Sequence, residues 1–174
     1  MPFFYENDVK HALHKMKFRG RLDLIKPFAG FAANALRERG LLSKTDVITY
    51  IPMSKKELRR HSCNQAEHLA KEIGKQTGLP VKQLLYKTAE TPSQHSLGLN
   101  RRKGNMIGIF EPLKECLPDI ENKTVLVVDD IITTGSTLNE AAKTLLIFGA
   151  EDVYAAGVAQ GKKKKHIQEK ENSL

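Results

Sequence analysis

Apolar positions along this chain alternate between two spacings, one typical of helices and one of strands. Apolar residues three or four apart predict helices over residues 8–18, 22–39, 64–76 and 138–148. Short apolar runs predict strands over residues 46–52, 81–86, 106–110, 125–129 and 153–158. Strands that alternate with helices favour an α/β domain, in which a central, mostly parallel sheet is flanked by helices.

Two polar segments interrupt this pattern. Residues 87–105 have little apolar periodicity and contain Pro92, Gly98 and Gly104. A connection of this length inside a compact domain is typically functional or disordered. The end of the chain is charged and includes the run Lys162–Lys165. We therefore expect one domain over residues 1–161 and a basic, flexible tail over residues 162–174.

The most apolar strand ends in two acids. Val125–Val128 is a continuous apolar run, as in a parallel strand covered on both faces, and Asp129 and Asp130 follow it directly. Ligands of open α/β sheets bind beyond the carboxyl ends of the strands. The two acids are therefore placed where a ligand is expected.

Hydroxyl residues and a glycine come next. The segment Thr133, Thr134, Gly135, Ser136 and Thr137 lies between the strand and the following helix. Thr137 and Glu140 have the spacing of a capping box. A helix N-terminus offers unpaired N–H groups and a positive dipole, both of which suit a phosphate. Five residues drawn only from Thr, Ser and Gly exceed what a cap needs, so they predict a phosphate cradle.

Phosphate binding alone does not explain the acids, because carboxylates repel phosphate. Carboxylates do accept hydrogen bonds from vicinal hydroxyls, and they suit a divalent cation. Asp129 and Asp130 beside a phosphate cradle therefore predict a sugar phosphate, with its hydroxyls at the acids and its phosphate at the helix.

The whole motif, VLVVDDIITTGST, resembles the phosphoribosyl-pyrophosphate (PRPP) motif of type I phosphoribosyltransferases. The resemblance implies the type I phosphoribosyltransferase fold with a mobile loop. It assigns Asp129 and Asp130 to the ribose hydroxyls and residues 133–137 to the 5-phosphate. It also implies Mg²⁺ that is bound through PRPP, with Asp129 or Asp130 in contact through water. Other phosphate-loop motifs, such as G-x-x-x-x-G-K-[ST], are absent from the sequence.

Two further segments resemble the ComF family of competence-associated phosphoribosyltransferase-like proteins. Residues 91–105 contain T-x-x-Q-x-x-L followed by Arg102 and Asn105, and Asn64–Gln65 match the end of the family's R-G-F-N-Q segment. His61–Ser62–Cys63 depart from that segment. Many ComF proteins also carry an N-terminal four-cysteine zinc ribbon, which this sequence lacks. Cys63 and Cys116 are far apart, so we expect no zinc site in this chain.

The resemblance also assigns roles to two loops. By analogy with type I enzymes, Met53, Ser54, Lys55 and Lys56 receive the pyrophosphate of PRPP. The 87–105 segment occupies the place of the mobile loop that closes over PRPP. Thr91, Gln94, Arg101 and Asn105 are its candidate residues, and Arg102 is the cation expected to act with Asp129 and Asp130 in catalysis.

Charge and composition agree with such ligands. The net charge of +8 favours anionic partners such as phosphorylated metabolites or nucleic acid. No apolar run is long enough to span a membrane, and two distant cysteines favour the reducing cytoplasm. Only 6% of the residues are aromatic and none is tryptophan, so a platform for stacking bases is not evident.

The leading hypothesis is thus a ComF-type phosphoribosyltransferase that binds PRPP with Mg²⁺ and uses an unknown acceptor. The resemblance implies a role in DNA uptake during natural transformation, with single-stranded DNA and other competence proteins as partners. One alternative is a nucleobase salvage phosphoribosyltransferase. The other is a protein without catalytic activity that senses PRPP or binds single-stranded DNA as an adaptor.

Overall fold

The computed structural model contains a central sheet of four parallel strands in the order β1-β6-β5-β2. The strands are β1 (Phe3–Phe4), β2 (Val47–Tyr50), β5 (Thr124–Ile132) and β6 (Asp152–Gln160). The structure describes the whole chain except residues 1–2, 5–10, 13–21, 61–62, 89–107 and 161–174. The α/β class and the parallel sheet that the sequence predicts are confirmed.

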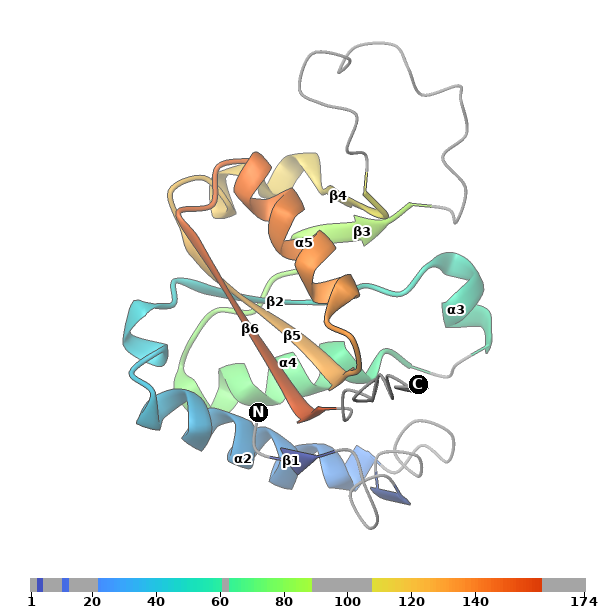
Figure 1. Cartoon of the computed structure of the whole chain (residues 1–174), viewed down its shortest axis with the longest axis vertical. Coiled ribbons are helices and arrows are strands. Elements are labelled where there is room, and N and C mark those ends of the chain that lie inside the picture. Colours follow the sequence, from blue (N-terminus) through green and yellow to red (C-terminus); the bar gives the residue numbers. More distant parts are fainter. Residues whose placement is uncertain (1–2, 5–10, 13–21, 61–62, 89–107, 161–174) are drawn as a thin grey trace, which may run out of the picture.

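Helices cover both faces of the sheet (Figure 1). On one face α2 (Ile25–Glu38) and α4 (Gln65–Thr77) pack together, and on the other lies α5 (Ser136–Ile147). Because side chains alternate along a strand, β5 supplies both cores. Leu126 and Val128 pack toward α2 and α4, while Val125 and Val127 pack toward α5. This double burial explains the unbroken apolar run in the sequence of β5.

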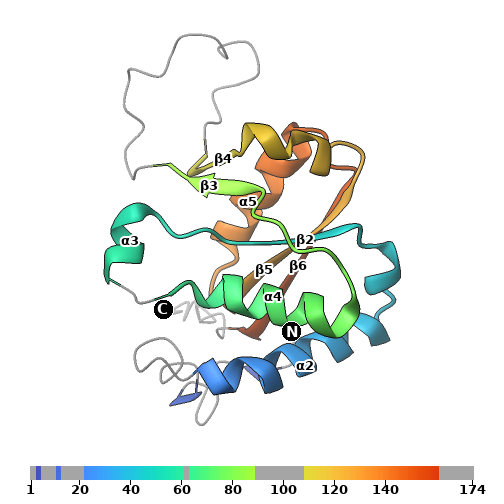
Figure 2. The same ribbon diagram turned by 180° about the vertical axis from the view of Figure 1, so that it is seen from behind.

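A second, smaller sheet lies beside α5 (Figures 1 and 2). It is an antiparallel pair formed by β3 (Leu85–Lys87) and β4 (Phe110–Pro112). One predicted strand is therefore changed, and the other is described only in part. The strand expected over residues 81–86 is reduced to a single bridge between Val81 and Ile48 followed by β3. Of the strand expected over 106–110, residues 106–107 lie outside the described residues, Gly108 and Ile109 are not in a strand, and β4 begins at Phe110. The pairing partner, which is distant in sequence, sets these limits.

Short elements complete the description. They are α3 (Lys55–Arg60) and the 3₁₀ turns Leu22–Leu24, Leu42–Lys44 and Lys114–Asp119. Within the described ranges, no helix is long and apolar enough to cross a membrane. Of the helix expected over residues 8–18 only residues 11 and 12 are described, and both are helical. The predicted tail, residues 162–174, lies outside the described residues.

Candidate functional site

The candidate site lies at the carboxyl edge of the sheet, where β2 ends alongside β5. Tyr50 of β2 pairs with Val128 of β5, and the N–H of Ile51 donates to the carbonyl of Val128 at 3.0 Å. Because the two strands are parallel, Asp129 and the segment after Tyr50 leave this pairing at the same edge. The structure therefore brings the two predicted ligand-binding segments, 129–137 and 53–56, to the same edge of the domain.

Asp129 and Asp130 are half-buried in the last part of β5. The backbone N–H of Asp130 donates to Asp129 Oδ1 at 2.8 Å, and the N–H of Ile131 donates to Asp130 Oδ1 at 2.7 Å. Each carboxylate thus accepts a hydrogen bond from the next residue along the chain. These bonds restrict the two side chains before any ligand is present.

The turn from β5 into α5 depends on Gly135. Its φ of 79° lies in the left-handed region, which glycine adopts without the strain of a side chain. Thr133, Thr134 and Ser136 are exposed around it. Thr134 Oγ1 and Ser136 Oγ lie 2.9 Å apart, and the N–H of Ser136 donates to Thr134 Oγ1 at 3.3 Å. The hydroxyls therefore cluster at the exposed start of the helix.

The predicted capping box of Thr137 and Glu140 is wrong. Helix α5 begins at Ser136 with Gly135 as its N-cap, so Thr137 already lies inside the first turn. Glu140 forms an ion pair with Lys143 at 3.0 Å. The N-cap at Gly135 lies two residues before the predicted cap at Thr137. Gly135 has no side chain, so the N-cap residue of α5 accepts no side-chain hydrogen bond from the first N–H groups of the helix.

The segment after β2 contains the capping box that the sequence analysis missed. Ser54 is buried, and its N–H donates to Glu57 Oε2 at 2.7 Å. In return the N–H of Glu57 donates to Ser54 Oγ at 3.2 Å. This reciprocal pair starts α3, with Lys55 and Lys56 exposed in its first turn and Met53 half-buried before it. The spacing Ser-x-x-Glu could have revealed the cap in advance.

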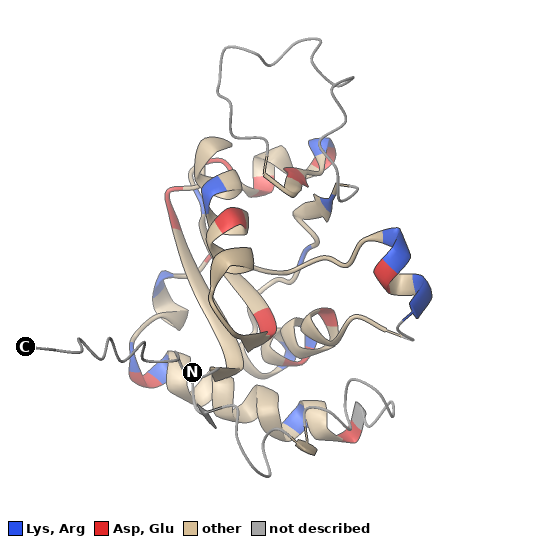
Figure 3. Cartoon of the chain, turned by 45° about the vertical axis from the view of Figure 1, so that its right-hand side comes forward, with Lys and Arg blue, Asp and Glu red and all other residues tan. Residues whose placement is uncertain are grey.

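Glu57 also reaches a different part of the fold. Its Oε1 accepts a hydrogen bond from Lys87 Nζ at 2.8 Å, across 30 positions of sequence. Burial alone would raise the pKa of Glu57, but the hydrogen bonds from Lys87 and Ser54 lower it to about 2. Glu57 is thus ionised, and it connects α3 to the end of β3 through Lys87. In Figure 3 the ribbon of α3 lies at the right-hand side of the molecule and is mostly blue, because the charged residues of α3 other than Glu57 are Lys or Arg.

Asn64 and Gln65 lie close to the same edge. Asn64 caps α4, since its Oδ1 accepts from the N–H groups of Ala66 and Glu67. Its Nδ2 donates to the carbonyl of Ile51 at 3.0 Å, which fixes the start of α4 against the end of β2. Gln65 is 1% exposed, and its Oε1 is the one fully buried side-chain oxygen without a partner in the described part of the chain. Asn64 of the Asn-Gln pair in the ComF resemblance therefore has a structural role here.

The mobile-loop candidates fall outside the described residues. These are Thr91, Gln94, Arg101, Arg102 and Asn105. The two ends of that segment are fixed, because Thr88 donates to the carbonyl of Ile109 through both its N–H, at 3.0 Å, and its Oγ1, at 3.1 Å. The segment connects β3 to β4, so it follows Lys87 at the end of one strand and precedes Phe110 at the start of the other.

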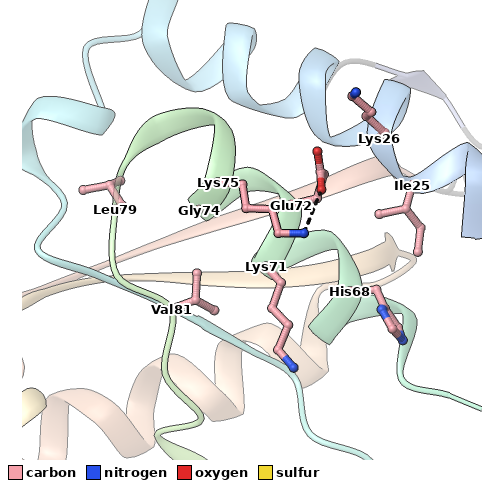
Figure 4. Close-up of a pocket in the computed structure, with 9 residues that line it drawn as sticks. All are labelled: Ile25, Lys26, His68, Lys71, Glu72, Gly74, Lys75, Leu79 and Val81. Atoms are coloured by element: carbon pink, nitrogen blue, oxygen red, sulfur yellow. Dashed lines mark ion pairs between the residues drawn. The ribbon is translucent and has the colours of Figure 1, made fainter.

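A surface groove of about 430 Å³ lies elsewhere, between α2 and α4 (Figure 4). Lys26, Lys71 and Lys75 line it together with Glu72, which pairs with Lys75. None of the predicted site residues that the structure describes lines this groove. This groove is an alternative binding site, so experiments that locate a ligand can distinguish it from the proposed site at the carboxyl edge.

The described residues contain no group of three or more His, Cys, Asp or Glu side chains that could hold a metal by themselves. Mg²⁺ is usually bound by one or two carboxylates together with substrate phosphates. The adjacent carboxylates of Asp129 and Asp130 fit this second arrangement. A magnesium ion would then reach the site with a phosphorylated ligand.

Comparison with known proteins places the chain in a family. The model of the phosphoribosyl transferase domain matches residues 58–173, which is more than half of the chain. Competence protein F of Haemophilus influenzae is 26% identical over 152 residues, which cover 85% of this chain and 66% of that protein. Competence protein ComFC of Streptococcus pneumoniae is 31% identical over 151 residues, which cover 87% and 63%. The chain thus spans about two thirds of the length of these relatives or less.

A solved structure agrees on the fold. The allosteric regulatory enzyme of purine biosynthesis superposes with a TM-score of 0.51 and 20% identity, over 77% of this chain and 25% of that one. The family match, the competence relatives and the observed parallel sheet together lead to one conclusion. The chain belongs to the phosphoribosyltransferase domain family, as a member of its ComF group.

Proposed function

We propose that this protein binds PRPP together with Mg²⁺ at the carboxyl edge of its sheet and transfers the phosphoribosyl group to an acceptor. The observation that carries the proposal is the continuous path from Asp129 and Asp130 to the left-handed Gly135 and the exposed start of α5. It offers carboxylates for hydroxyls and, within a few residues, N–H and hydroxyl donors for a phosphate.

Each part of the edge has a chemical task in this proposal. Asp129 and Asp130 accept hydrogen bonds from the ribose hydroxyls, and residues 133–137 bind the 5-phosphate. Residues 53–56, at the end of β2, receive the pyrophosphate, where Lys55 and Lys56 supply positive charge. Bound Mg²⁺ would neutralise charge on the pyrophosphate as it leaves. The acceptor then attacks the anomeric carbon while the carbon–oxygen bond to pyrophosphate breaks.

The relatives suggest the setting for this activity. Two of them are named competence proteins, and a role in DNA uptake is therefore proposed for this chain as well. Single-stranded DNA and other competence proteins are the partners that this role implies, and the basic net charge of +8 suits a nucleic acid. The salvage of a nucleobase and a PRPP-sensing role without turnover are the competing functions, which a screen of acceptors with Mg–PRPP would separate.

The proposal is tested by calorimetric titration of the protein with PRPP, with and without Mg²⁺. We expect saturable binding that strengthens with Mg²⁺. Asp129→Asn should weaken it roughly tenfold or more, because an amide replaces a charged acceptor for the ribose hydroxyls. The absence of binding by the folded wild-type protein would overturn the proposal.

A matched variant controls for the loss of charge. Asp152→Asn removes an exposed carboxylate at the amino end of β6, at the opposite edge of the same sheet. It should bind PRPP as the wild type does. Equal weakening by both substitutions would mean that Asp129 has no specific role in the site.

A further inference from the structure

We propose that Glu57 is a positioning residue for the pyrophosphate end of the site: it holds the segment after β2 and the ammonium group of Lys87 in one fixed arrangement. This inference rests on the proposed function, because it concerns the same bound PRPP. It adds two residues, Glu57 and Lys87, that neither the motif nor the family resemblance singles out.

Both oxygens of Glu57 are used, and they face different elements. Oε2 accepts from the backbone N–H of Ser54 at 2.7 Å, inside the segment proposed for pyrophosphate. Oε1 accepts from Lys87 Nζ at 2.8 Å, at the end of β3. One carboxylate therefore sets the position of a loop and of a cation that belongs to the other sheet.

Lys87 is held in surroundings that make this contact important. Its side chain is 18% exposed, and that of Glu57 is 34% exposed. A charged side chain that is mostly shielded from water needs a partner, and losing that partner is more damaging than at an open surface. Lys87 has three N–H donors, and the bond to Glu57 Oε1 uses one of them. The other two can serve a second anion without breaking the pair.

A role of Glu57 through its charge alone and a positioning role predict opposite changes in PRPP affinity, and this makes the inference testable. Glu57→Gln removes one negative charge close to the proposed pyrophosphate segment. If Glu57 acted only through its charge, PRPP would bind more tightly to the variant. If Glu57 positions Lys87, PRPP binds more weakly, because the ammonium group loses the partner that fixes it.

The variants are chosen to separate these outcomes without unfolding the loop. Glutamine can still accept from the N–H of Ser54, since Gln also serves in a capping box. Lys87→Met removes the cation and keeps an apolar stem of similar length. Asp119→Asn is the matched control: it removes the negative charge from the Lys82–Asp119 pair at 2.6 Å, which also joins two distant segments but involves none of the proposed site residues.

The experiment is calorimetric titration of each variant with PRPP and Mg²⁺, after thermal melts confirm folding. We expect Glu57→Gln and Lys87→Met each to weaken binding about tenfold, as for the loss of one charge-assisted hydrogen bond. The double variant should be no weaker than Lys87→Met, because both changes remove the same interaction. Asp119→Asn should leave the affinity unchanged.

Two results would overturn the inference. One is a Glu57→Gln variant that binds PRPP as tightly as the wild type or more tightly. The other is a double variant whose loss equals the sum of the two single losses in free energy. The proposed function is judged separately by the wild type and by Asp129→Asn. If these behave as expected while Glu57→Gln binds normally, only the positioning role of Glu57 fails.

Discussion

Two turns at the same edge of the sheet follow neighbouring parallel strands, yet they use their hydroxyl groups differently. After β2, Ser54 is buried and exchanges two hydrogen bonds with Glu57 at the start of α3. After β5, Thr133, Thr134 and Ser136 are exposed, and the turn is made by the left-handed backbone of Gly135.

The difference indicates where a ligand can make its bonds. In the first turn, the N–H of Ser54 is already paired and its buried hydroxyl accepts from Glu57, so we expect the exposed side chains of Lys55 and Lys56 to make the contacts to an anion. In the second turn a glycine makes the reversal, and the hydroxyls remain at the surface. Because a helix N-terminus favours anions, this turn is the better place for a phosphate.

The largest effect is expected at Gly135. Gly135→Ala forces a side chain into a φ of 79°, which costs about 1–2 kcal/mol of the free energy of unfolding. The added Cβ would meet Ile132 only at 3.9 Å, so the strain lies in the backbone. PRPP affinity should also fall, about tenfold, because the phosphate turn is displaced. Urea unfolding and calorimetric titration measure the two effects.

Gly40→Ala is the control for this prediction. Gly40 has a φ of 64°, and a Cβ there would meet no atom within 4 Å. The substitution should destabilise the protein to a similar extent and leave PRPP affinity unchanged. Loss of affinity in both variants would show that PRPP binding reports only general stability.

Smaller effects are expected at the two serines, Ser54 in the turn after β2 and Ser136 in the turn after β5. Ser54→Ala removes a buried cap and should lower the free energy of unfolding by about 1 kcal/mol. Ser136→Ala removes an exposed hydroxyl and should change it by less than about 0.5 kcal/mol, while weakening PRPP binding. The reverse pattern, with Ser136→Ala the more destabilising variant, would contradict the division of roles between the turns.

The smallest effect is expected in the stability of the protein at acidic pH. The pKa of Glu57 in the folded protein is about 2, below its ordinary value of 4.5, so its ionised form stabilises the fold at neutral pH. That stabilisation is present above pH 4.5 and is lost as the pH falls toward 2. Because Glu57 is one third exposed, solvent screening keeps the effect small. Wild type should therefore lose slightly more stability than Glu57→Gln between pH 5 and pH 3, as measured by urea midpoints.

The sequence predicted the parallel sheet and the acidic strand end because both depend on local patterns. The run Val125–Val128 is buried on both faces, and its four consecutive apolar residues indicate this burial from the sequence alone. The limits of β3 and β4 were not predictable in this way, since they depend on pairing between Leu85 and Pro112 across an intervening segment.

Local signals also competed at the helix starts. Thr137 and Glu140 matched a capping pattern, but the left-handed Gly135 started α5 one residue before Thr137. Ser54 and Glu57 matched the same pattern, and there the cap formed. The ion pair between Glu57 and Lys87 could not be predicted, because only the fold brings those two residues together.

The most direct test of the central claim is to locate bound PRPP by amide chemical shifts in ¹H–¹⁵N NMR spectra with Mg²⁺ present. We predict that the largest changes fall on residues 129–137 at the β5–α5 turn, with a second group on residues 53–56. Changes confined to the groove between α2 and α4, around Lys26, Lys71 and Lys75, would contradict the assignment of the site to the carboxyl edge.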